Sequence, residues 1–212
     1  AIDQIGQFIA RHGEQKGPQR LGGDLVPART DRVGLAVTIA PYLRGRVSAQ
    51  NRWIGSFSDA PDVLQFVNSR YAKDLAFLGT SCPDHFIRTK IRPLFVPWAA
   101  DEDVQTLKNR IDAGLTEYRQ LYRDYYHQFA TADSPALRDT SPAVVLIQGL
   151  GMFTFGKNKT EARIIGEFYT NAIHVMEGAS LLAEGEVKDT LPQCGEGMDP
   201  KSFKMFANYV AL

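Results

Sequence analysis

The sequence has little cysteine or histidine, no excess of charge of either sign and no long hydrophobic run. Its two cysteines, Cys82 and Cys194, cannot build a disulfide framework, which favours a reducing compartment such as the cytoplasm. Lysine and arginine together number 24, as do aspartate and glutamate, so the basic balance typical of nucleic-acid-binding domains is missing. No apolar stretch approaches the roughly 18 residues that a membrane span requires. We therefore expect neither nucleic acid nor a membrane among the partners.

The 212 residues otherwise have the ordinary mixture of a globular protein, with 44% hydrophobic and 23% charged residues. The first residue is Ala1 rather than methionine, and no basic flank followed by an apolar run indicates a signal peptide. We expect a piece of a larger protein with three parts: an N-terminal helical and loop segment (1–50), an α/β domain (51–185) and an acidic tail leading to a linker (186–212).

Apolar periodicity predicts alternating helices and strands. Spacings of three and four predict the clearest helix over 101–129, where the tyrosines share one apolar stripe and are expected in the core rather than on a stacking surface. The apolar run 143–147 predicts a buried strand, which a glycine turn and residues 152–155 separate from a helix over 158–183. This order indicates α/β layering. The other expected elements are helices over 2–9, 31–46 (kinked or divided at Pro41), 59–67 and 72–78, and strands over 52–57 and 91–96, the latter at a sheet edge or bulge because it contains Pro93.

The glycines after the buried strand invite two nucleotide-binding interpretations, and both fail. A dinucleotide fingerprint requires a third glycine where Thr154 stands. A P-loop would match Gly151, Gly156 and Lys157, but Asn158 lacks the hydroxyl that binds magnesium, and the intervening residues are too bulky to wrap a phosphate. A tight turn that lets the next helix pack on the sheet is the better interpretation.

The segment 80–90 gathers a thiol, a carboxylate, an imidazole and two cations. Cys82 and His85 have a plausible spacing for two metal ligands, but a site needs a third and a fourth, and the sequence contains no His-x-His or Cys-x-x-Cys pair. A Cys/His nucleophile pair lacks an identifiable orienting residue. A turn before an edge strand, with Asp84 as a cap, is the plainer alternative, so no metal ligands are assigned.

Four phrases carry a resemblance to a known family: FSDAPDVLQFVNS (57–69), GTSCPDHFIRTKIRPLFV (79–96), VVLIQGLGMFTFGK (144–157) and EARIIGEFYTNAIHVMEGA (161–179). They resemble the bifunctional rhamnulose-1-phosphate aldolase/short-chain alcohol dehydrogenases, which are long bacterial proteins with a class II aldolase/adducin-type region ahead of a Rossmann dehydrogenase domain. The resemblance falls on the second half of the aldolase region. It implies a layered α/β domain of the class II aldolase/adducin type, with a central sheet flanked by helices and preceded by a helical N-terminal segment.

The resemblance also implies where the chemistry of such an enzyme would lie. In that superfamily a His-x-His pair and a later His-Gly-Leu-Phe motif bind the divalent metal, whereas here the first is missing and Leu150 stands in the histidine slot of the second. The expected activity is cleavage of rhamnulose 1-phosphate to dihydroxyacetone phosphate and lactaldehyde, followed by oxidation of the lactaldehyde. Zinc in the first aldolase lobe and NAD in the dehydrogenase domain are therefore implied for the parent enzyme, with neither cofactor in this inactive segment. The implied partners are a small sugar phosphate, the other domains of the parent chain and further copies in a homo-oligomer.

Within this framework two sets of residues are candidates for the site. Arg88, Lys90 and Lys157 are expected to meet a sugar phosphate, and Asp84 and His85 are the acid–base candidates if the lobe has chemistry of its own. Two alternatives remain open: a self-sufficient metal-dependent class II aldolase that uses His85, and an adducin-like structural or interaction module.

Overall fold

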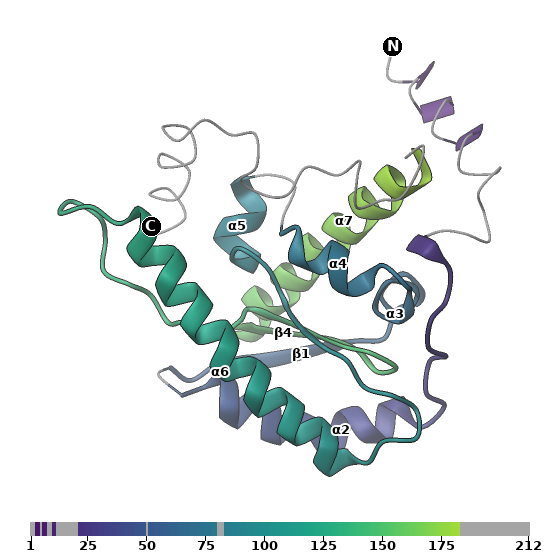
Figure 1. Ribbon diagram of the computed structural model, residues 1–212, viewed down its shortest axis with the longest axis horizontal. Coiled ribbons are helices and arrows are strands. Elements are labelled where there is room, and N and C mark those ends of the chain that lie inside the picture. The colour runs from purple at the N-terminus through teal and green to yellow at the C-terminus, as the bar shows by residue number, and fades with distance from the viewer. Residues whose placement is uncertain are drawn as a thin grey trace.

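A computed structural model gives the placement of residues 3–4, 6–7, 10–11, 21–49, 51–79 and 83–182. In this part of the chain helices surround one four-stranded sheet, which confirms the mixed α/β class (Figure 1). The described positions of the expected N-terminal helix are helical, whereas the acidic tail, Cys82 and Cys194 lie outside the described residues. The finer likeness to a layered aldolase/adducin domain stays a prediction.

The sheet has the strand order β1-β4-β3-β2. Its strands are β1 (Ile54–Ser58), β2 (Leu94–Val96), β3 (Val144–Ile147) and β4 (Gly151–Gly156). β4 runs antiparallel to both β1 and β3, and β2 runs parallel to β3 at the far edge. β2 begins directly after Pro93, so the expected edge position of this proline-containing segment is confirmed.

A tight turn joins β3 to β4 and explains the glycines there. Gly149 and Gly151 have φ angles of +78° and +137°, which glycine alone adopts readily. A Cβ atom on Gly151 would lie 2.5 Å from the carbonyl oxygen of Ser58 on β1. Gly149 and Gly151 therefore belong to the turn and first strand position of a β-hairpin.

Helices pack against both faces of this sheet, with α2 and α6 on one side and α3, α4, α5 and α7 on the other (Figure 1). Their bounds are α2 (Arg32–Val47), α3 (Pro61–Asn68), α4 (Ala72–Phe77), α5 (Pro83–Thr89), α6 (Val104–Phe129) and α7 (Lys159–Leu182). Among the described helices, none is both long and apolar enough to cross a membrane.

Alternation along the strands divides the apolar side chains between two cores. One core joins α2 and α6 to alternate strand residues, among them Ile39, Leu43, Leu107, Ile111, Val145, Ile147, Phe153 and Phe155. The other joins α3, α4 and α7 to the intervening ones, among them Val63, Phe66, Leu75, Val144, Leu146, Met152, Ile165 and Tyr169. Because β3 is buried on both faces, its residues are apolar without interruption.

The apolar stripe of α6 is confirmed as core. Tyr118 and Tyr122 are buried with stacked rings, and the Tyr118 hydroxyl donates a hydrogen bond to the carbonyl of Arg92. Asp103 precedes the helix as its N-cap, accepting a hydrogen bond from the backbone nitrogen of Thr106 at 2.7 Å. Its side chain thus satisfies a backbone donor at the start of the helix.

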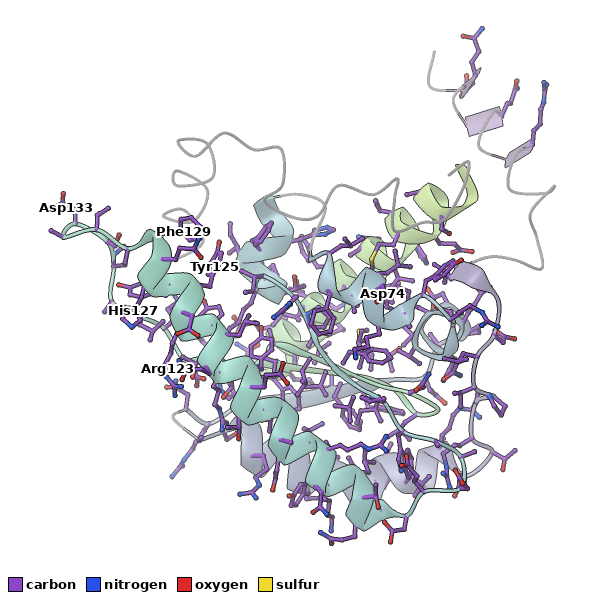
Figure 2. All side chains as sticks on the ribbon, in the orientation of Figure 1. Asp74, Arg123, Tyr125, His127, Phe129 and Asp133 are labelled. Carbon is purple, nitrogen blue, oxygen red and sulfur yellow. The ribbon has the colours of Figure 1, made fainter. Side chains whose placement is uncertain are left out.

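Figure 2 shows where the burial of α6 ends. The end of the helix that carries Tyr125, His127 and Phe129 reaches past the sheet toward Asp133. Here Tyr125 and Phe129 pack on each other with ring centres 5.4 Å apart, and both are only half-buried. The stripe is therefore buried fully only where the helix lies against the sheet.

Two expected features of the chain take a different form in the structure. The helix expected to be kinked or divided at Pro41 is continuous: α2 runs through the proline from Arg32 to Val47. Pro41 is exposed and Val37, one turn earlier, is 70% exposed, so the carbonyl left without a helical donor lies on the solvent side. The segment expected as a turn before β2 instead contains the helix α5.

Candidate functional site

The acid–base candidates lie on α5, against α7. The imidazole of His85 is buried and meets the ring of Phe168 edge-on, with centres 5.5 Å apart. One turn later in α5, the buried Thr89 hydroxyl donates a 2.8 Å hydrogen bond to the carbonyl of His85. The side chain of Asp84 lies outside the described residues. Among the side chains that the structure describes, no three histidine, cysteine, aspartate or glutamate residues gather to hold a metal ion.

Lys90 follows α5 and points its side chain inward. Its ammonium group donates hydrogen bonds to the carbonyl oxygens of Asp139 and Ser141 and lies 4.7 Å from the ring centre of Tyr122. Burial lowers the pKa of Lys90 to about 8, with the Asp139 carboxylate opposing this shift and Arg138 adding to it. Lys90 thereby ties the end of α5 to the segment that leads into β3.

The Asp139 carboxylate is held by donors from another part of the chain. It accepts hydrogen bonds from the side-chain nitrogen of Asn51 at 2.9 Å and from the indole nitrogen of Trp53 at 3.0 Å. The backbone nitrogen of Ser141 donates a third, at 2.8 Å. Burial opposes ionisation, but these hydrogen bonds and Lys90 outweigh it and lower the pKa of Asp139.

The structure brings two of the three cationic candidates to one end of the sheet. Lys157 follows β4 directly, and Ser141, which binds Lys90, lies just before β3. Because β3 and β4 are antiparallel, these two positions fall at the same end. Arg88, two residues before Lys90, has an exposed side chain, as does Lys157. The Lys90 ammonium is already bound by carbonyl groups, whereas the other two side chains reach solvent.

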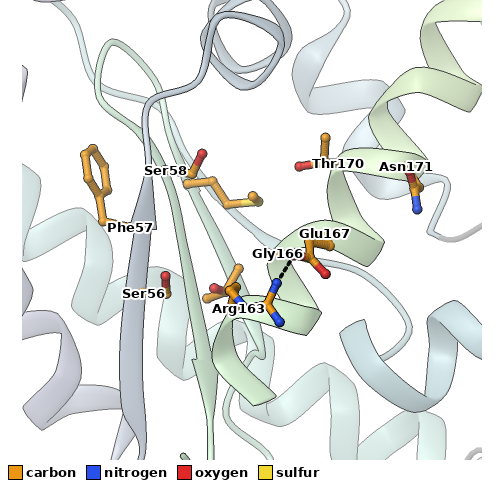
Figure 3. Close-up of a pocket in the computed structure, with 10 residues that line it drawn as sticks. Ser56, Phe57, Ser58, Arg163, Gly166, Glu167, Thr170 and Asn171 are labelled. Atoms are coloured by element: carbon orange, nitrogen blue, oxygen red, sulfur yellow. Dashed lines mark hydrogen bonds and ion pairs between the residues drawn. The ribbon is translucent and has the colours of Figure 1, made fainter. Parts of the chain in front are cut away.

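A cavity of about 380 Å³ lies between β1 and α7, and most of its accessible lining surface is apolar. Figure 3 shows β1 on one side of it and α7 on the other. It is lined by Ser56, Phe57, Ser58, Met152, Thr154, Arg163, Gly166, Glu167, Thr170 and Asn171. We refer to it as the β1–α7 cavity.

The alternation of β1 explains why a hollow exists there. Ser56 and Ser58 occupy alternate positions and line the cavity, whereas the Phe57 ring points away from α7 in Figure 3 and packs against Phe153, with centres 4.8 Å apart. Two small side chains therefore stand where larger ones would fill the space beneath the helix.

The position of α7 is fixed by its contact with β4. The Thr154 hydroxyl, in the middle of β4, donates a buried 2.7 Å hydrogen bond to the carbonyl of Ala162 in the first turns of α7. Gly166, one turn later, would place a Cβ atom 3.6 Å from the same hydroxyl oxygen. The helix thus lies closest to β4, and it also lies near β1.

An ion pair on α7 borders the cavity. Arg163 donates a hydrogen bond to the carboxylate of Glu167, one turn along the helix, and both side chains are more than half exposed, at 61% and 57%. Figure 3 shows this pair below Thr170, whose hydroxyl points toward β1. Donors and acceptors of several kinds therefore surround one open space.

Sequence reasoning did not find this cavity. Its residues come from β1, β4 and α7, and no motif or short spacing connects Ser56 to Thr170. The available signal was the alternation of small polar residues on β1, which is unusual for a strand face directed toward a helix.

Comparison with known proteins assigns the family. Residues 34–184 match the family described as "Aldolase class II, second domain". The chain therefore belongs to the family of class II aldolase second domains. It is also 37% identical over 147 residues to a Bacillus subtilis (strain 168) protein named "Uncharacterized oxidoreductase YuxG". That alignment covers 69% of this chain but 21% of the relative, so the chain spans about a fifth of the relative's length. No solved structure matches the chain.

Proposed function

We propose that this chain is one domain of a bifunctional enzyme that cleaves rhamnulose 1-phosphate to dihydroxyacetone phosphate and lactaldehyde and then oxidises the lactaldehyde. The observation that carries the proposal is a pairing: the chain is a class II aldolase domain, and it aligns with a small part of a long protein named an oxidoreductase. An aldolase reaction that yields an aldehyde supplies a substrate for an oxidoreductase in the same chain. We place this enzyme in the cytoplasm, as a homo-oligomer.

The described residues of this domain do not fit the two cofactors that such an enzyme would use. The part of the chain that the structure describes offers no cluster of three metal-binding side chains for zinc. The glycines considered above for dinucleotide binding belong to the β3–β4 hairpin. We therefore assign zinc and NAD to other parts of the parent enzyme and derive no step through them here.

The contribution proposed for this domain is to hold the phosphorylated end of the substrate. Arg88 and Lys157 have exposed side chains, and Lys157 and Lys90 lie at one end of the sheet. Cationic side chains of this kind bind phosphate oxygens by charge-assisted hydrogen bonds. Lys90 would contribute mainly by ordering the neighbouring segment, because its ammonium group already binds two carbonyl oxygens. Asp84 and His85 stay the acid–base candidates.

The experiment replaces Arg88 and Lys157 by alanine, singly and together, in the full enzyme that carries this domain. Loss of phosphate contacts should raise the KM for rhamnulose 1-phosphate about tenfold or more, which corresponds to about 1.4 kcal/mol, with a smaller change in kcat. Lys73→Ala on α4 is the matched control, since Lys73 is also exposed but lies on another helix. Equal KM values in the double variant and the control would remove the phosphate-binding role. An enzyme without aldolase activity on this substrate would contradict the reaction itself.

A further inference from the structure

We propose that the β1–α7 cavity binds a small uncharged polyhydroxylated molecule, such as a ketose or a sugar alcohol. The inference concerns a site separate from Arg88, Lys90 and Lys157 and does not require the aldolase reaction proposed above. It rests on the size, lining and charge of the cavity.

The size of the cavity and its hydrogen-bonding side chains favour a small ligand that combines hydroxyl groups with apolar surface. At about 380 Å³, the cavity lies within the range of roughly 300–1,000 Å³ typical of small-molecule sites. The hydroxyl groups of Ser56, Ser58 and Thr170 can each donate and accept hydrogen bonds, and the Asn171 amide adds a donor and an acceptor. A molecule with several hydroxyl groups matches such a mixture, because each of its groups also donates and accepts.

The charge of the cavity favours an uncharged ligand. Arg163 is the cationic side chain among the lining residues, and it is neutralised by its hydrogen bond to Glu167. A phosphate would have to compete with this carboxylate. The pair is suited to a diol instead, since the guanidinium can donate to one hydroxyl group while the carboxylate accepts from the next.

The cavity does not favour a base or another flat aromatic ligand. Phe57 is the aromatic residue of the lining, and its ring points away from the cavity and packs on Phe153 (Figure 3). Met152 instead supplies apolar surface from β4. An apolar floor beneath hydrogen-bonding walls suits the carbon skeleton and hydroxyl groups of a sugar.

The test is calorimetric titration of the purified chain with a panel of ketohexoses and hexitols, with inorganic phosphate as the competing class of ligand. We expect at least one neutral polyol to bind saturably with a Kd of about 1 mM or below. Phosphate should not bind in this cavity, so any phosphate binding to the protein should be the same in the Glu167→Gln variant. Glu167→Gln and Thr170→Val should each weaken polyol binding about tenfold. Glu167 is exposed and Thr170 is half-buried, so neither change removes a fully buried core side chain.

Two matched variants control for the chemistry of these substitutions. Glu117→Gln on α6 and Thr38→Val on α2 change exposed residues of the same types far from the cavity lining and should leave binding unchanged. Absence of polyol binding across the panel would overturn the proposal. Equal weakening by Thr170→Val and Thr38→Val would do the same. Self-association of the chain that Glu167→Gln abolishes, without polyol binding, would also overturn it and assign the cavity to an interface between copies.

Discussion

At the scale of single residues, Tyr169 stands out because its hydroxyl group is buried in an apolar core. The residue lies on α7 and is fully buried against α3, where its ring meets the ring of Phe66 edge-on. Its hydroxyl has no hydrogen-bond partner among the described residues, and burial raises its pKa. A buried polar group in this state destabilises the folded protein, because it loses hydrogen bonds to water and gains none.

Removing this hydroxyl should stabilise the protein. We predict that Tyr169→Phe raises the free energy of unfolding by about 1 kcal/mol, as measured by urea denaturation. Tyr42→Phe is the matched control and should lower it by about the same amount, because the Tyr42 hydroxyl donates a 2.8 Å hydrogen bond to Asp112. If Tyr169→Phe proves as destabilising as Tyr42→Phe, the Tyr169 hydroxyl is hydrogen-bonded in the folded protein and the prediction is wrong.

Burial of individual residues could be predicted from the sequence where a regular pattern repeats. Leu107, Ile111 and Leu115 recur at helical spacing, and all three are buried. The partners of polar residues could not be predicted in this way. Lys90 binds the carbonyl of Asp139, 49 residues later, and no local pattern indicates such a distant pair. The same holds for the β1–α7 cavity, whose walls come from separate elements.

At the scale of elements, Lys90 connects the end of α5 to the segment before β3. The contribution of Lys90 to the free energy of unfolding should depend on pH, and its pKa gives the sign of this dependence. Its pKa is about 8 in the folded protein, whereas the ordinary value is 10.5. Between these two pH values the unfolded chain binds a proton at this lysine that the folded protein has released. The free energy of unfolding that Lys90 contributes should therefore rise with pH in this window and stay level below it.

The prediction is tested by comparing the protein with its Lys90→Met variant by urea denaturation at several pH values between about 7 and 10. The free energy of unfolding of the unmodified protein minus that of the Lys90→Met variant should increase with pH once the pH exceeds about 8. The slope should be at most about 1.4 kcal/mol per pH unit. Lys73→Met at an exposed position of α4 should show no such rise. A level difference across the whole range for Lys90→Met would contradict the assignment of an uncharged amine at high pH.

Most elements could be predicted from periodicity and from glycine and proline positions, and the exceptions have physical causes. Pro41 was expected to kink or divide a helix, but its position on the exposed side lets α2 continue without a break. The helix α5 was missed because it is short, at seven residues, and forms against α7 rather than by its own periodicity. The continuity of α2 thus depends on which side of the helix faces solvent, and the formation of α5 depends on its contact with α7.

At the scale of the whole molecule, one narrow sheet separates two apolar cores, and the polar features lie at its margins. The Lys90–Asp139 contacts occupy the end of the sheet where β3 begins, and the β1–α7 cavity follows the outer strand β1. The mixed α/β class could be predicted from the order of strand, turn and helix, but the strand order could not, because it depends on long-range pairing. The sequence resemblance supplied the aldolase family, which the comparison confirms for residues 34–184.

The central proposal is that this class II aldolase domain holds no metal ion of its own and serves an active site that other parts of the parent enzyme complete. The most direct test is elemental analysis of the purified chain after exposure to zinc and dialysis, together with calorimetric titration with zinc. We predict far less than one zinc ion per chain and no saturable zinc binding. One tightly bound zinc ion per chain, lost in a His85→Ala variant that folds normally, would contradict this account and support a self-sufficient metal-dependent aldolase.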